Sequence, residues 1–212
     1  MRRLSNKRIF QASGLAFMLA ALVAIIIPPA NAQQPPVRVR GEIVKVEGNQ
    51  LFVKSRDGSG LVVNIPDNVG VSGVVKIALA DIKPGSYIGV SAMPDADGSQ
   101  NALHIHIFPE ALRGVAEGHG PWDVRPGATM TNATVDQIAA VGEGRTIMVK
   151  YKDGEKKIVV PADIPIVTYL PGTRDELKPG AKIFIIAAQR QPDGSVDAAR
   201  ISVGRDGLTP PM

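Results

Sequence analysis

The sequence predicts an all-β protein made of two tandem, small OB-like β-barrels that follow an N-terminal signal peptide. An uncharged apolar run near the N-terminus indicates the signal peptide. Short segments of alternating apolar residues, separated by turns rich in Gly, Asp and Pro, indicate β-strands. A residue pattern that returns after about 96 positions indicates that the β-region is duplicated. Helical periodicity is nearly absent beyond residue 32, which favours the all-β class.

Residues 1–32 have the composition of a cleavable secretory signal peptide. Four basic residues and no acidic residue precede 14 uncharged residues, Gly14–Ile27. As a helix at ~1.5 Å per residue this run reaches about 21 Å, less than the ~30 Å hydrocarbon core. Pro28 and Pro29 end the run, and Ala30-Asn31-Ala32 offers the small residues that signal peptidase requires. We therefore predict cleavage after Ala32 and export to the periplasm; an uncleaved membrane anchor is the alternative.

Composition excludes several classes of protein. The chain has 24 Lys+Arg and 20 Asp+Glu, and four of the basic residues lie in the leader, so residues 33–212 carry no net charge. Nucleic-acid binding needs a concentrated basic face, and we expect no nucleic-acid partner. The absence of cysteine excludes disulfides and a lipid-anchored lipoprotein. No second apolar segment follows the leader, so we expect no stable membrane span after cleavage.

Three pairs of motifs carry the predicted duplication. They recur in the same order at spacings of 95 or 96, and they are Val53–Gly58 with Val149–Gly154, Asp81–Gly85 with Glu176–Gly180, and Asp97–Ser99 with Asp193–Ser195. Chance or a shared turn vocabulary can explain one such match but hardly all three. The predicted domains are residues 33–113 and 130–212, joined by a Gly/Pro-rich linker over 114–129.

Each copy is expected to contain five or six short antiparallel strands. In the first copy the predicted strands are Val37–Glu47, Leu51–Ser55, Leu61–Ile65, Val71–Ile77, Tyr87–Met93 and Ala102–Phe108. Gly48-Asn49 and Asp57-Gly58 supply tight turns, because glycine accepts a positive φ. In the second copy, Thr173 is expected to cap one short helical turn. A closed barrel removes the exposed edges of so small a sheet, which favours an OB-like barrel over a generic small barrel or sandwich.

These motifs resemble a known family. They are G-x-I-x-x-V at Gly41, Ile43 and Val46, L-x-V-K-x-x-D-G at Leu51–Gly58, D-I-K-P-G at Asp81–Gly85 and the later D-G-S. The pattern is similar to bacterial exported domains of unknown function with an OB-like β-barrel, and it covers both copies. Similar sequences sometimes carry the label "metal ABC transporter permease". A permease needs several membrane helices, so we interpret that label as mistaken or derived from a neighbouring gene.

His104 and His106 form an H-x-H pair on a predicted strand, so both side chains project from one face. Such a pair can bind zinc or copper, with His119, Glu117 or Asp123 completing the ligand set. The duplication aligns Ile105 and Ile107 with apolar residues of the second copy, so these isoleucines should point into the barrel. We therefore expect the histidines to face outward, towards solvent or the connecting segment. That placement equally suits an ordinary polar face.

The linker contains the chain's only tryptophan, Trp122, beside Asp123. One interpretation makes Trp122 and Asp123 contacts for a partner or ligand. The favoured interpretation is that Trp122 packs the linker against a barrel and sets the relative orientation of the two.

No motif indicates catalysis. The chain has no cysteine nucleophile, no Gly-x-Ser-x-Gly turn, no phosphate-binding glycine loop and no H-E-x-x-H. The carboxylates cluster at turns, where they hydrogen-bond the backbone. The sequence thus predicts a soluble, non-enzymatic periplasmic protein that binds or scaffolds an unknown protein or small ligand, without a cofactor. The competing prediction is a metal-binding accessory that holds zinc or copper through His104, His106 and His119.

Overall fold

The computed structural model describes residues 35–141 and 144–212, and the predicted signal peptide lies outside these residues. The described chain is all-β: three short 3-10 turns, η1 (Leu79–Asp81), η2 (Glu110–Leu112) and η3 (Arg174–Glu176), are its helical elements. None of its helices has the length and apolar character needed to cross a membrane.

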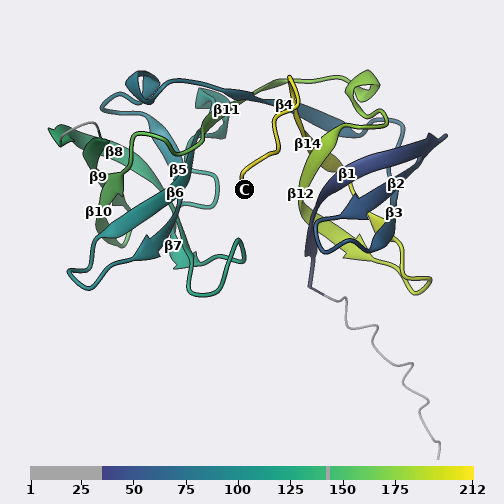
Figure 1. Cartoon of the computed structure of the whole chain (residues 1–212), viewed down its shortest axis with the longest axis horizontal. Helices are drawn as coiled ribbons and strands as arrows, with labels where there is room; N and C mark the ends of the chain where they lie inside the picture. The colour runs from purple at the N-terminus through teal and green to yellow at the C-terminus, as the bar shows by residue number, and fades with distance from the viewer. Residues whose placement is uncertain (1–34, 142–143) are drawn as a thin grey trace, which may run out of the picture. The chain divides into compact units, whose positions relative to one another are not determined.

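Fourteen strands make up the described chain (Figure 1). The strands of its first half are β1 (Val37–Glu47), β2 (Gln50–Ser55), β3 (Gly60–Asn64), β4 (Gly70–Lys76), β5 (Tyr87–Pro94) and β6 (Gln100–Ile107). Those that follow are β7 (Gly118–Pro121), β8 (Thr129–Val141), β9 (Gly144–Tyr151), β10 (Gly154–Val160), β11 (Ile166–Pro171), β12 (Lys182–Arg190), β13 (Val196–Asp197) and β14 (Arg200–Gly204). The strands predicted for the first copy agree with β1 to β6 to within two residues at each end.

The predicted turn chemistry is present. Gly48 and Gly58 have φ of 53° and 89°, values that the two hairpins require and that glycine adopts without strain. The aspartates of the turns bond to nearby residues as expected: the Oδ1 atoms of Asp57, Asp97 and Asp193 each accept hydrogen bonds from the N–H and the hydroxyl of the serine two residues later. Before η3, the Thr173 N–H donates to the Glu176 carboxylate.

Strands β1, β2, β3, β13 and β12 form a closed five-stranded β-barrel, because β12 pairs back onto β1. We call it the first ring. The pairings of β5, β6, β10, β9 and β8 also return to their start, and these strands are the second ring. Each ring encloses its own cluster of buried aliphatic residues, the first around Ile43 and Ile185 and the second around Ile88 and Ile147.

Each ring takes strands from both halves of the sequence, as Figure 1 shows by colour. The first ring joins β1–β3 to β12 and β13, and the second joins β5 and β6 to β8–β10. The predicted domain boundaries, 33–113 and 130–212, are therefore wrong as boundaries of self-contained barrels. Strand β4 links the two assemblies, because it pairs with β14 on one side and with β11 on the other.

The physical reason for the exchange is that the two halves carry the same alternating pattern. Strands β5 and β12 present similar apolar faces, so the pattern does not distinguish which of them should close against β1. The structure pairs β1 with β12 through Arg40 opposite Phe184 and Glu42 opposite Lys182. The predicted linker also contains an element that its Gly/Pro composition concealed, strand β7, which pairs with β8.

Candidate functional site

His104 and His106 lie on β6 and, as predicted, project from the face opposite Ile105, which belongs to the core of the second ring. The expectation that they face solvent is wrong: His104 is 1% exposed and His106 is 5% exposed. Aromatic residues cover this outer face of the ring. The rings of Phe108 and Tyr169 lie 4.6 and 5.7 Å from the ring of His106, each edge-on to it.

The neighbouring strands complete a cluster around the two histidines. On β5, Ser91 lies opposite His104, and Gly89 lies opposite His106. Strand β8 is the other neighbour of β5, and it places Met130 opposite Ser91 and Asn132 opposite Gly89. The larger side chains of β6 and β8 thus flank the two small residues of the central strand, β5. We call these six residues the histidine cluster: Gly89, Ser91, His104, His106, Met130 and Asn132.

Gly89 leaves the space that His106 occupies. A Cβ atom on Gly89 would lie 2.1 Å from Nε2 of His106 and 2.6 Å from Oδ1 of Asn132. Both contacts are far shorter than van der Waals distances, so the imidazole lies over the backbone of β5. A glycine inside a strand commonly marks such a close approach.

Four buried polar atoms of the histidine cluster lack partners, although Asn132 Nδ2 donates to the Ala116 carbonyl. Five buried side-chain polar atoms of the described residues have no hydrogen bond, and four of them are in the cluster: Ser91 Oγ, His104 Nε2, His106 Nδ1 and Asn132 Oδ1. The fifth is Trp122 Nε1. An unsatisfied buried polar group typically costs about 1–3 kcal/mol, so native proteins contain few of them. Their concentration at one place distinguishes this cluster from the rest of the chain.

Both imidazoles are neutral at pH 7. Burial, with a smaller contribution from the charge of Arg40, lowers the pKa of His104 to about 4. Burial, followed by repulsion from His104, lowers the pKa of His106 to about 3. One ring nitrogen of each neutral imidazole therefore keeps a free lone pair, which it can offer to a ligand, and the other carries a hydrogen.

A pocket of about 410 Å³ lies beside β7 and reaches the histidine cluster. Met130 and Asn132 are in its wall. The remaining lining residues are Arg38, Ala116, Glu117, Gly118, His119, Gly120, Pro121, Trp122 and Asp153. The pocket thus connects two residues of the cluster with exposed residues of the linker.

His119 is not brought together with His104 and His106. It lies on β7 opposite Thr131, and its Nδ1 is 2.8 Å from the Thr131 hydroxyl. Thr131 adjoins Asn132 along β8, so alternation places it on the face opposite the cluster. Within residues 35–141 and 144–212, no three His, Cys, Asp or Glu side chains are placed to hold one metal ion.

Trp122 and Asp123 make contacts within the molecule. The guanidinium of Arg38 lies 4.0 Å from the centre of the Trp122 ring, and the ring packs against a buried group that includes Phe184 and Met212. Asp123 accepts hydrogen bonds of 2.7 and 3.2 Å from Arg40. Burial raises the pKa of Asp123, but its two arginine neighbours outweigh this effect and lower it overall. These contacts agree with the favoured interpretation, in which Trp122 packs the linker against a barrel.

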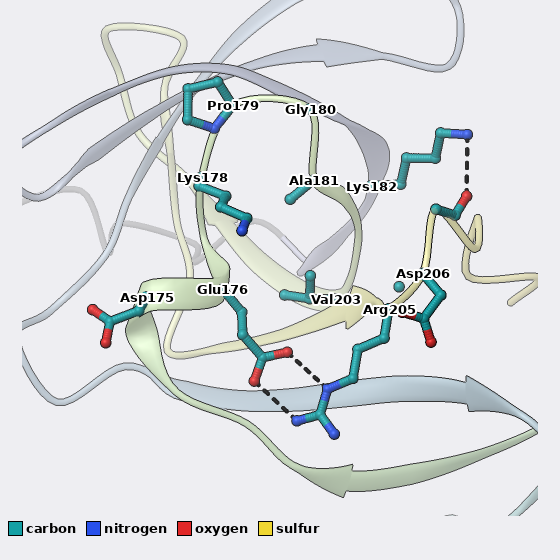
Figure 2. Close-up of a pocket in the computed structure, with 12 residues that line it drawn as sticks. Asp175, Glu176, Lys178, Pro179, Gly180, Ala181, Lys182, Val203, Arg205 and Asp206 are labelled. Carbon is teal, nitrogen blue, oxygen red and sulfur yellow. Dashed lines mark hydrogen bonds and ion pairs between the residues drawn. The ribbon is translucent and has the colours of Figure 1, made fainter.

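A larger pocket, of about 710 Å³, lies between the Lys178–Gly180 turn and the Arg205–Gly207 turn (Figure 2). Two of its charged groups are paired with each other: Arg205 donates to both carboxylate oxygens of Glu176, at 3.0 and 2.9 Å (Figure 2). Arg205 also donates to the Pro171 carbonyl. None of the described buried polar atoms that lack hydrogen bonds belongs to a residue lining this pocket, in contrast to the histidine cluster.

Sequence reasoning singled out His104 and His106 but missed Gly89, Ser91, Met130 and Asn132. Gly89 carried a signal, because an isolated glycine inside an apolar strand suggests a close backbone approach. Met130 and Asn132 carried none, since only the pairing of β5 with β8 brings them to the histidines.

No protein-family model, curated protein or solved structure matches this chain significantly.

Proposed function

We propose that the protein is an exported, non-enzymatic binding protein of the bacterial periplasm whose ligand site is the histidine cluster. The leader composition supports export, and the duplicated motifs together with the matching pairings of the two rings support a pair of OB-like barrels that have exchanged strands. The observation that carries the binding role is the gathering of four unpartnered buried polar atoms at one place. A ligand that bonded to them would remove an energetic cost that the unliganded protein bears.

The route to the site is the pocket beside β7. Met130 and Asn132 line this pocket and belong to the histidine cluster, whereas His104 and His106 do not line it. A small ligand in this pocket would therefore reach the histidines past Met130 and Asn132. Arg38 and Trp122 also line the pocket. A partner protein docked at Trp122 is a weaker candidate, because Trp122 and Asp123 already contact Arg38 and Arg40.

The chemistry of the cluster supports binding rather than catalysis. Ser91 and His104 are neighbours across β5 and β6, but neither Ser91 Oγ nor His104 Nε2 has a hydrogen-bond partner. A serine nucleophile needs a hydrogen bond to its base, and the base in turn needs an orienting group. The aspartates of the three Asp-Gly-Ser turns are exposed and hold backbone N–H groups.

The test is a thermal-denaturation screen of the chain from Gln33 onward, which keeps every described residue. The probes are Cu(I) under anaerobic conditions, Zn(II), inorganic phosphate, single amino acids and monosaccharides. A ligand present at 100 times its Kd stabilises by ~2.7 kcal/mol, which raises Tm by about 5–10 °C in a chain of this size.

The comparison protein carries His104→Leu and His106→Leu together. The surface control is Lys54→Leu, at an exposed position of β2 that does not line the pocket. We expect at least one probe to stabilise the unmodified and Lys54→Leu proteins but not the double variant. If every probe shifts Tm equally in all three proteins, or in none, the proposed site is wrong.

A further inference from the structure

We propose that the ligand of the histidine cluster is one Cu(I) ion, held by His104, His106 and Met130. This inference rests on the proposed binding function and names the chemical class of its ligand.

The donor atoms available are neutral. Two imidazoles and the thioether of Met130 line the cluster, and Ser91 and Asn132 add a hydroxyl and an amide oxygen. The charged group that acts on His104 is Arg40, a cation. A divalent ion among these groups would remain uncompensated in a buried environment, where an isolated charge is costly. A monovalent ion reduces that cost.

Ligand softness points to the same ion. Thioether sulfur selects soft metals such as Cu(I), and imidazole also suits copper. Zinc sites in proteins generally have three or four nitrogen, sulfur or carboxylate ligands in tetrahedral geometry. The cluster has two such nitrogen ligands, and the chain contains no cysteine. Cu(I), in contrast, accepts two or three ligands.

The strand register places the three donor residues on one face of the sheet, on either side of β5. The rings of His104 and His106 are stacked with centroids 5.9 Å apart and planes inclined by 25°. Met130 is on the opposite side of β5, and the small Ser91 between it and His104 leaves room for the flexible methionine side chain. Nε2 of His104 and Nδ1 of His106 are buried and lack hydrogen bonds, as metal-binding nitrogens require before the metal arrives.

Met130 also connects the cluster with the outside. It is 9% exposed and lines the 410 Å³ pocket, so among the three donor residues it lies nearest the surface. The histidines lie behind it at 1% and 5% exposure. This order of exposure suits capture by the thioether followed by transfer to the imidazoles.

The experiment is an anaerobic titration of the chain from Gln33 onward with Cu(I), in competition with a chromophoric Cu(I) chelator. We expect one Cu(I) per chain, and binding of Zn(II) under the same conditions should be weaker. Met130→Leu keeps the volume but removes the sulfur, so it should weaken Cu(I) binding at least about 10-fold, because losing even an outer-shell partner of a metal ligand commonly costs that much. The double His104→Leu, His106→Leu variant should not bind the ion stoichiometrically, and Lys54→Leu should bind it like the unmodified protein.

Folding of the variants is checked by near-ultraviolet circular dichroism. Leucine removes nitrogens that have no hydrogen-bond partner, so these substitutions break no hydrogen bond at those atoms. Failure of the unmodified protein to bind Cu(I), tighter binding of Zn(II), or Cu(I) binding that persists in the folded double variant would each overturn the inference. If a non-metal probe stabilises the unmodified protein but not the double variant, the binding function stands and the copper assignment falls. If no probe does so, both fall.

Discussion

Polar groups on the outer face of β6 and at Arg205, which follows β14, are in opposite environments. His104 and His106 on β6 are buried, neutral and without hydrogen bonds at Nε2 and Nδ1. Arg205 is partly exposed and donates to Glu176 and to the Pro171 carbonyl. The predicted duplication aligns β6 with the segment that contains β14, so similar strand frameworks support both arrangements. The difference indicates that the charged group stabilises its turn, whereas the histidines are available to a ligand.

A second comparison concerns the glycines beneath these groups. His106 lies over Gly89 of β5, and Arg205 lies over Gly73 of β4, where a Cβ would be 2.3 Å from the Arg205 Nε. Both glycines make room for a long side chain above a strand. The buried imidazole is confined by Phe108 and Tyr169, but the guanidinium can move into solvent. Similarly short Cβ distances at Gly89 and Gly73 therefore do not imply that alanine destabilises the protein equally at the two positions.

The largest expected effect tests whether each ring contains strands from both halves of the sequence. Glu42 and Lys182 are opposite each other in a pair of strands, at a position where no backbone hydrogen bonds join them, and Cα atoms are then about 4.5 Å apart. Glu42→Cys with Lys182→Cys should form a disulfide almost completely, because this distance suits the bond and the chain has no other cysteine. Electrophoresis without reductant checks the result.

The matched control is Glu42→Cys with Tyr87→Cys, because a self-contained first barrel would place Tyr87 where the structure has Lys182. Tyr87 instead pairs with Thr134 of β8, so we expect no disulfide in this variant. A disulfide in the control and none in the first pair would show that the rings do not exchange strands.

The second prediction compares alanine substitutions at Gly89 and Gly73. Gly89→Ala should destabilise the protein by about 2 kcal/mol, the usual cost of overpacking a rigid interior, and lower Tm by about 4–8 °C. Gly73→Ala should lower Tm less, because Arg205 can move aside. Neither glycine has a positive φ, so the backbone tolerates alanine at both positions. Thermal unfolding of the two variants makes the comparison, and an equal or larger loss for Gly73→Ala would contradict it.

The smallest effect concerns the ion pair near β14. The hydrogen bonds from Arg205 outweigh the effect of burial and lower the pKa of Glu176. A carboxyl whose pKa is lower in the folded state stabilises the protein above its unfolded pKa and loses this contribution as the pH falls through its folded pKa. Glu176→Gln should therefore lower Tm by at most a few degrees at pH 7, and the difference should shrink towards pH 3. A difference that grows on acidification would contradict this account.

Much of the local structure could be predicted from the sequence. Alternation of apolar residues located β1 to β6, and the Gly and Asp turns located the hairpins, because both signals depend on neighbouring residues. The same alternation placed His104 and His106 on the face opposite Ile105. It could not show that this face is buried, because Tyr169 and the residues of β8 are brought there by pairings between distant segments.

The sequence by itself determined the strands, the turns between them and the side of β6 to which each residue points. Only the tertiary structure decided which strands close each ring, since two halves with one pattern offer each strand two suitable partners. It also decided which polar atoms are left without partners, because strands from both halves contribute Ser91, His104, His106 and Asn132. Local periodicity specifies the face of a strand, whereas long-range pairing specifies what lies against that face.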